Sequence, residues 1–222
     1  EKIEPSCYWS AEMICSGHYG DLWDTIILFY TKYIHLGNPK LAIYLDMRIS
    51  SFKDIVNNGF RSNELQLRNN EKIRRLFCEI VCILCMAKRR HSYDSVKIRD
   101  MDYDMTKMME KMKATKLTYG EQSFKEEDPK ELFISINELA YNVSKDNQNV
   151  MNGCYWMEWI LEFEKRAKRK KDKIECERRA KMKVDSKFQK EIVWIIWDII
   201  LNESESRSKI IQKIIKSLLS IF

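Results

Sequence analysis

The residues of this chain with the clearest chemistry are the cations gathered in residues 165–190. This segment holds 13 Lys or Arg against four Asp or Glu, so it carries +9 while the rest of the chain carries −3, within a total of +6. Clustered cations bind phosphates by releasing counterions, without reading the base sequence. The predicted nucleic-acid contacts are Lys165, Arg166, Lys168, Arg169, Lys170, Lys171, Lys173, Arg178 and Arg179 of this segment, together with Lys88, Arg89 and Arg90.

Other interpretations of these cations stay open at this point. The basic segment is also typical of a solvated helix face, or of a surface for an acidic protein partner. Lys88 to Arg90 also suit the C-terminal end of a helix, where cations are favourable to the dipole. Phe188 is the only aromatic residue between the cations of residues 165–190, so no stacking platform for single strands is predicted.

Three cysteines have a spacing that brings their sulfurs to one stripe of a helix. Cys78, Cys82 and Cys85 stand at i, i+4 and i+7 in an apolar stretch. A structural zinc site needs a fourth ligand and commonly uses short C-x-x-C loops, and the nearest histidine in sequence, His91, lies beyond the expected helix end. Because free cysteine packs like a small apolar residue, we expect these side chains in the core and predict no metal site.

Motifs for bond-breaking chemistry are absent from the sequence. There is no G-x-x-x-x-G-K-[ST] phosphate loop, no H-E-x-x-H and no G-x-S-x-G, which are patterns of nucleotide hydrolases, zinc peptidases and serine hydrolases. The histidines are scattered, and Glu126, Glu127 and Asp128 fall in a polar stretch where a buried, pKa-shifted carboxyl pair is not expected. The sequence therefore predicts a non-enzymatic protein without a cofactor.

The elements that would position these residues are predicted to be helices. Six Gly and three Pro in 222 residues are few for sheets joined by tight turns, so the expected fold class is all-α. Apolar periodicity predicts helices over residues 5–16, 20–36, 41–58, 71–88, part of 98–112, and 208–222, with a loop at 60–69. We expect the cations of residues 165–190 on one long basic helix of about 35–40 Å.

Local signals predict where several helices begin and end. Gly17 suits the left-handed position after the first helix, and Asn38-Pro39 suits the cap and first residue of a third helix. Asn70 suits the cap of the helix that starts at Glu71, and the turn residues Asn57-Asn58-Gly59 suit the end of the helix before it. The apolar face of the amphipathic C-terminal helix must pack against its own domain, against a partner subunit or on a membrane surface.

Two blocks of the chain resemble a known family. The first contains Tyr8, Trp9, Ala11, Met13, Gly17, Asn38 and Pro39, and the second is EKIRRLFCEIVCILCMAKRRHSY at 71–93, with Ala87, Lys88 and Tyr93 near their counterparts. Together they resemble the C-terminal helical region of the MgsA/RarA/Werner-helicase-interacting ATPases, over about residues 4–98. The chain departs from the family pattern at two places. It has Lys32-Tyr33-Ile34-His35 where the family has E-D-I-G, and it lacks the Pro and one further residue of the family's A-P-K-S-N turn.

The resemblance implies a helical unit like a clamp-loader collar, which supports oligomer assembly, without the family's separate ATPase domain. We expect this collar-like domain at residues 1–115, a linker at 116–128, and a second helical domain at 129–222. Cys154-Tyr155-Trp156 repeats Cys7-Tyr8-Trp9, so a diverged copy of the first unit is one interpretation of the second.

These patterns and the resemblance lead to a DNA replication or recombination accessory protein. We expect a homo-oligomer with DNA and with replication or repair proteins as partners, and no membrane. Seven Cys without paired spacing indicate a reducing, cytoplasmic or nuclear compartment. The alternatives are a helical scaffold for a replication ATPase or another partner without nucleic-acid binding, and an RNA-binding helical protein. The Lys, Ile and Asn bias is typical of an AT-rich genome, for example that of a large DNA virus.

Overall fold

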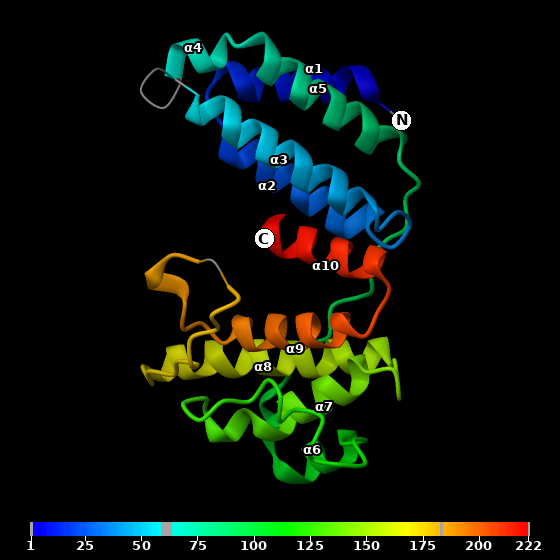
Figure 1. The fold of residues 1–222 in the computed structure, drawn as a ribbon, viewed down its shortest axis with the longest axis vertical. Helices are drawn as coiled ribbons and strands as arrows, with labels where there is room; N and C mark the ends of the chain where they lie inside the picture. Colours follow the sequence, from blue (N-terminus) through cyan, green and yellow to red (C-terminus); the bar gives the residue numbers. More distant parts are fainter. Residues whose placement is uncertain (1, 59–63, 183, 222) are drawn as a thin grey trace. The chain divides into compact units, whose positions relative to one another are not determined.

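A computed structural model describes residues 2–58, 64–182 and 184–221 of this chain (Figure 1). The described residues form ten α-helices and contain no strand, which confirms the all-α prediction. They fall into two compact units. The first unit contains the described residues up to Asp94 and those from Lys216 on, and the second unit spans Ser95–Ile215. None of the helices in the described part of the chain is long and apolar enough to cross a membrane.

The first unit is built around a helix that is apolar on one side. This helix, α5, buries Ile73, Phe77 and Ile80 completely, as expected from its apolar periodicity. Both α1 and α3 pack against it, and α1 also packs against α2. The elements are α1 (Ile3–Cys15), α2 (Tyr19–Phe29), the π-helical turn η1 (Tyr30–Ile34), α3 (Leu41–Asn57), α4 (Glu64–Arg68) and α5 (Glu71–Met86).

Two of the predicted helix ends are confirmed by the backbone. Gly17 has φ 81, the left-handed conformation in which a residue without Cβ is not strained. The side chain of Asn70 accepts hydrogen bonds from the backbone N–H groups of Lys72 and Ile73, at 2.9 and 3.3 Å. The cap therefore satisfies two of the N–H groups that the first turn of α5 leaves without helical partners.

Other predicted boundaries differ from the structure. Helix α3 begins at Leu41, as predicted, but Asn38 and Pro39 are not its cap and first residue, because their carbonyls accept bonds from the N–H groups of Leu41 and Ala42 in a tighter turn. The helix expected over 20–36 becomes π-helical at Tyr30, where the carbonyl accepts from the N–H of His35. Within the expected loop at 60–69, residues 64–68 form α4, while residues 59–63, including Gly59, lie outside the described residues.

Removing the Asn70 cap should destabilise the first unit. We expect Asn70→Ala to lower the free energy of unfolding by about 1 kcal/mol, because two N–H groups at the start of α5 lose their acceptor. Urea unfolding followed by far-UV circular dichroism would measure the change. Asn70→Asp keeps an oxygen acceptor and should retain the parental stability, whereas equal losses in both variants would contradict the capping role.

The second unit has its core between three helices. Helix α7 packs against both α8 and α9, and the side chains of Ile136, Trp156 and Ile195 at this junction are completely buried. The elements are the 3-10 turn η2 (Asp100–Tyr103), α6 (Met105–Lys111), η3 (Lys130–Leu132), α7 (Phe133–Val143), α8 (Val150–Lys170), η4 (Ser186–Phe188) and α9 (Val193–Glu205). The last helix, α10 (Lys209–Ile221), begins in this unit, and its residues from Lys216 on are assigned to the first unit.

The two units divide at Asp94 and Ser95, ahead of the linker predicted at 116–128. Residues 116–128 belong to the second unit and are held there by polar side chains of α7. The side chain of buried Asn137 accepts from the N–H of Gly120 at 3.0 Å and donates to the carbonyl of Lys116 at 2.9 Å. A Cβ on Gly120 would lie only 3.0 Å from the Asn137 backbone, so the polar, Gly-containing stretch forms a closely packed loop.

The prediction of one long basic helix over 165–190 is wrong. Helix α8 ends at Lys170, and Lys171 adopts a left-handed conformation with φ 64 that turns the chain away. The N–H of Asp172 then bonds back to the carbonyl of Ala167 at 3.0 Å, which closes the helix end. The described residues that follow form a loop with the short turn η4, and Cys176 and Met182 in this loop are buried.

Candidate nucleic-acid interface

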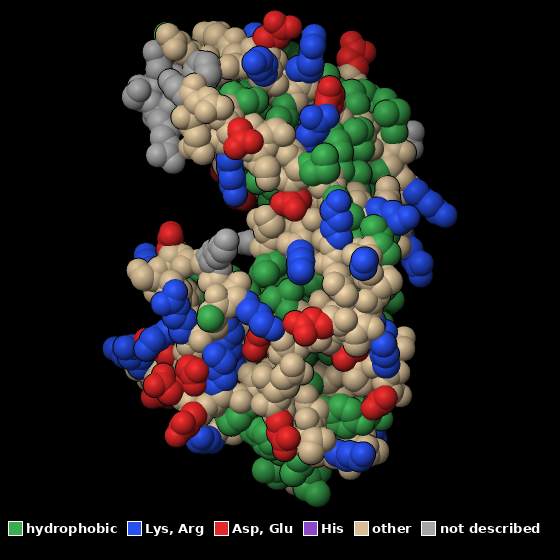
Figure 2. All heavy atoms as spheres, viewed as in Figure 1, with side chains coloured by type: hydrophobic (Ala, Val, Ile, Leu, Met, Phe, Trp, Pro, Cys, Tyr) green, Lys and Arg blue, Asp and Glu red, His purple; other side chains and the backbone are tan. Residues whose placement is uncertain are grey.

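The C-terminal half of α8 and the loop after it carry most of the predicted cations. Apolar residues of α8 such as Trp156 and Ile160 hold the helix in the core, so its last turns extend Lys and Arg side chains along one edge of the unit. In Figure 2, Lys and Arg side chains gather over this end of α8 and the following loop, with Asp and Glu side chains among them. The electrostatic character of the edge depends on which cations are paired.

Many of these cations already have an acidic partner. Lys165 and Arg169 pair with Glu162, Lys168 pairs with Glu164 at 3.2 Å, and Lys173 pairs with Glu175 at 3.0 Å. Bonds from the Lys173 and Lys190 side chains lower the pKa of half-buried Glu175, even though partial burial works against them. Exposed pairs of this kind exchange readily with solvent and contribute little to stability, but they reduce the positive potential of the edge.

Three exposed cations of the predicted set, Lys170, Lys171 and Arg178, form no ion pair within the described residues. Lys170 ends α8 and Lys171 follows it in the left-handed position. Arg178 lies in the loop, where its backbone carbonyl accepts a 3.0 Å hydrogen bond from the Lys125 side chain. Among the predicted contacts on this edge, these three side chains are best able to bind phosphate oxygens.

Arg179 does not contribute to such a surface, and its predicted role as a phosphate contact is corrected. Its side chain is 1% exposed and forms a two-pronged ion pair with Asp128, at 2.7 and 2.5 Å. It also donates to the carbonyls of Ser123 and Glu177. Burial opposes its charged form, but the bonds to Asp128 outweigh burial and raise its pKa above the ordinary value.

This buried pair fixes the loop that carries Arg178. Asp128 also accepts hydrogen bonds from the backbone N–H groups of Lys125 and Glu177, each at 2.9 Å. Asp198 of α9 lies 3.7 Å from the Arg179 guanidinium, and its pKa is raised because it is buried, despite the cations around it. The loop is therefore anchored by the pair of Arg179 and Asp128, which are 51 positions apart in sequence. Sequence periodicity does not reveal this contact.

An aromatic pocket lies beside Lys170. It has a volume of about 540 Å³ and is lined by Tyr103, Trp159 and Phe163 together with Lys130, Arg166 and Lys170. The Arg166 guanidinium lies 4.1 Å from the centre of the Tyr103 ring and pairs with Asp100. Trp159 and Phe163 precede Arg166 and Lys170 by seven residues on the same helix, a spacing that the sequence shows. Tyr103 comes from the separate segment η2, and only the tertiary structure places it beside them.

In the first unit, Lys88, Arg89 and Arg90 follow α5 in an extended stretch rather than capping a helix end. Backbone bonds hold this stretch beside η1, since the N–H of Arg90 donates to the carbonyl of Tyr33 at 2.7 Å. The guanidinium of Arg89 lies 5.5 Å from the centre of the Phe29 ring. All three side chains are exposed, and no ion pair involves them among the residues that the structure describes.

The residues of the family-like motif have mixed environments. Tyr8 and Trp9 are exposed, at 58% and 66%, and their rings pack edge to face. Ala11, Pro39 and Tyr93 are exposed, while Met13, Asn38 and Ala87 are half-buried. In the triplet that resembles Cys7-Tyr8-Trp9, by contrast, Trp156 is fully buried. The Trp residues of the two triplets therefore have opposite burial.

The prediction that three cysteines of α5 pack in the core is right only for Cys85. Cys85 is buried, Cys82 is half-buried and Cys78 is exposed. Cys78 and Cys82 lie close to Cys7 of α1. The spacing of the cysteines along α5 does not predict that Cys7 lies beside them. Only the packing of α1 against α5 reveals this cluster.

Comparisons with protein-family models, with curated proteins and with solved structures found no match for this chain. The resemblance to the helical region of the ATPases therefore stays a prediction.

Proposed function

We propose that this protein is a non-enzymatic accessory factor of DNA replication or recombination that binds the phosphates of nucleic acid through the edge formed by the end of α8 and the following loop. The observation that carries the proposal is the set of exposed cations Lys170, Lys171 and Arg178, which have no ion pair within the described residues. Assembly into oligomers through apolar helix faces is part of this proposal.

Several features support phosphate binding without base readout. The cations lie at a helix end and on a loop anchored by Asp128 and Arg179, so the backbone that carries them is held in place before a ligand binds. The more exposed pairs around them, such as Lys173 with Glu175, can rearrange toward phosphates at little cost. Contacts to phosphates of this kind position a protein on nucleic acid but do not specify a sequence.

Reversing the three unpaired charges tests the proposal. The variant Lys170→Glu, Lys171→Glu, Arg178→Glu should bind duplex DNA more weakly and with a shallower dependence on salt. If each side chain neutralises one phosphate, the slope of log K against log salt should decrease in magnitude by about 2.7. Fluorescence anisotropy across a salt series would measure it, with light scattering on the same samples to report the oligomeric state.

A control with the same change of net charge separates local contacts from overall charge. The variant Lys53→Glu, Lys72→Glu, Arg75→Glu changes exposed cations of the first unit and should retain most of the affinity and the parental slope. An equal loss in both variants would indicate attraction by net charge alone. A clear preference for RNA over duplex DNA at one salt concentration would replace DNA with RNA in the proposal.

A second candidate function is a helical scaffold for a replication ATPase or another protein, without nucleic-acid binding. The large exposed rings of Tyr8 and Trp9 on α1 favour it, because exposed aromatic residues are frequent in protein interfaces. This function predicts no DNA binding at low salt in the parental protein. It also predicts that reversing Lys170, Lys171 and Arg178 leaves partner binding unchanged.

A further inference from the structure

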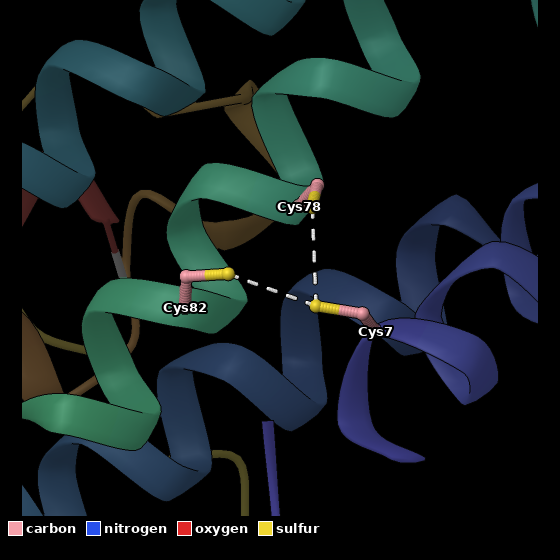
Figure 3. Close-up of side chains that lie close together, drawn as sticks. All are labelled: Cys7, Cys78 and Cys82. Atoms are coloured by element: carbon pink, nitrogen blue, oxygen red, sulfur yellow. Dashed lines mark hydrogen bonds between the residues drawn. The ribbon is translucent and has the colours of Figure 1, made fainter. Parts of the chain in front are cut away.

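Three sulfur atoms from two helices converge within the first unit. The Sγ atom of Cys7 lies 3.9 Å from that of Cys78 and 3.7 Å from that of Cys82, and all three lie within 4.8 Å of one another. Figure 3 shows the Cys7 side chain reaching from α1 toward the two cysteines of α5. Cys78 and Cys82 are one turn apart on α5, so a regular helix fixes their separation.

The two separations from the Cys7 sulfur match those of thiolates around one metal ion. With metal–sulfur bonds of about 2.3 Å, sulfur atoms are about 3.8 Å apart in a tetrahedral site and about 4.0 Å apart in a trigonal one. The free side chains therefore need only small adjustments to take up such a site. The packing of α1 on α5 provides the fixed support that a metal site requires.

The character of the ligands favours a soft ion. Thiolates select monovalent copper or zinc over the hard, oxygen-preferring ions. A structural zinc site almost always has four protein ligands, whereas this group holds three, with no further His, Cys, Asp or Glu joined to it among the described residues. Copper(I) is compatible with three thiolates alone, so the ligand count distinguishes the two ions.

The cluster is also accessible to an ion from solvent. Cys78 is exposed, while Cys7 and Cys82 are half-buried. Without metal, burial and the neighbouring sulfurs raise the pKa of Cys7 to about 12, so its neutral thiol is the prevailing form at neutral pH. A metal ion that takes up these sulfurs would displace their protons into solvent.

We infer that Cys7, Cys78 and Cys82 form a three-thiolate site for one copper(I) ion. In the binding step each thiol that becomes a ligand releases its proton, and copper remains monovalent, so no electron acceptor is required. The site lies in the first unit and does not depend on nucleic-acid binding by the second.

The inference is tested by titrating the reduced protein with copper(I) under anaerobic conditions, in competition with a coloured copper(I) chelator. We expect one ion per chain. Cys7→Ser and Cys82→Ser should each weaken copper binding by more than about 10-fold. Substituting a residue that only contacts a metal ligand already weakens metal binding by about this factor, and these variants remove a ligand itself. The matched control is Cys15→Ser, an exposed cysteine of the same helix as Cys7, which should bind copper as the parental protein does.

Circular dichroism of each variant shows whether α1 and α5 remain folded, and Cys78→Ser provides a second variant at the most exposed ligand. Equal copper affinity in the parental protein and all the cluster variants would overturn the site. A parallel titration with zinc, if it gave tighter binding than copper, would overturn the choice of ion. No uptake of copper by the fully reduced parental protein would overturn metal binding altogether.

Discussion

Asp128→Ala should destabilise the unit spanning Ser95–Ile215 by about 3–5 kcal/mol. The change leaves the guanidinium of Arg179, which is 1% exposed, as a buried charge without its principal partner. It also removes the acceptor for the N–H groups of Lys125 and Glu177, so the loop between α8 and α9 loses its anchor. Urea unfolding followed by circular dichroism would measure the loss.

Two further variants identify the source of this effect. The double variant Asp128→Ala, Arg179→Met removes both charges and should recover part of the stability, because no unpaired charge remains in the interior. Glu110→Ala breaks the exposed pair with Lys107 and should change the free energy of unfolding by less than about 1 kcal/mol. A double variant no more stable than Asp128→Ala would show that the lost backbone bonds dominate.

Trp156→Ala should have a comparable effect on the same unit, about 3–5 kcal/mol. Trp156 is completely buried in the core between α7, α8 and α9, and its removal would leave a large cavity that the surrounding helices only partly fill. Its indole N–H has no hydrogen-bond partner among the described residues. Trp156→Phe should therefore be much less destabilising than Trp156→Ala, since no bond is lost. Thermal unfolding would rank the variants.

Trp9→Ala is the matched control for this prediction. Trp9 follows Cys-Tyr in the sequence as Trp156 does, but it is 66% exposed. Its replacement should change the free energy of unfolding by no more than about 0.5 kcal/mol. A large loss for Trp9→Ala would mean that its ring is covered in solution, for example by another subunit, and would support the predicted oligomer.

Local features of this protein were determined by its sequence. The all-α fold followed from few Gly and Pro and from apolar periodicity, and the end at Gly17 and the cap at Asn70 followed from residue type alone. Each of these depends on interactions within a few residues, such as a hydrogen bond from a backbone N–H to a side chain two or three positions away. The positions of most helices could be predicted for the same reason.

Only the tertiary structure decided which of the chemically capable residues are available. Arg179 and Lys171 both belong to one basic segment, but an ion pair with Asp128, 51 positions away, buries the first, while the second stays exposed. Cys7 joins Cys78 across 71 positions, and the Trp residues of the two Cys-Tyr-Trp triplets have opposite burial. Burial and pairing depend on contacts between distant segments, and a local pattern of charge or periodicity contains no information about which segments those are.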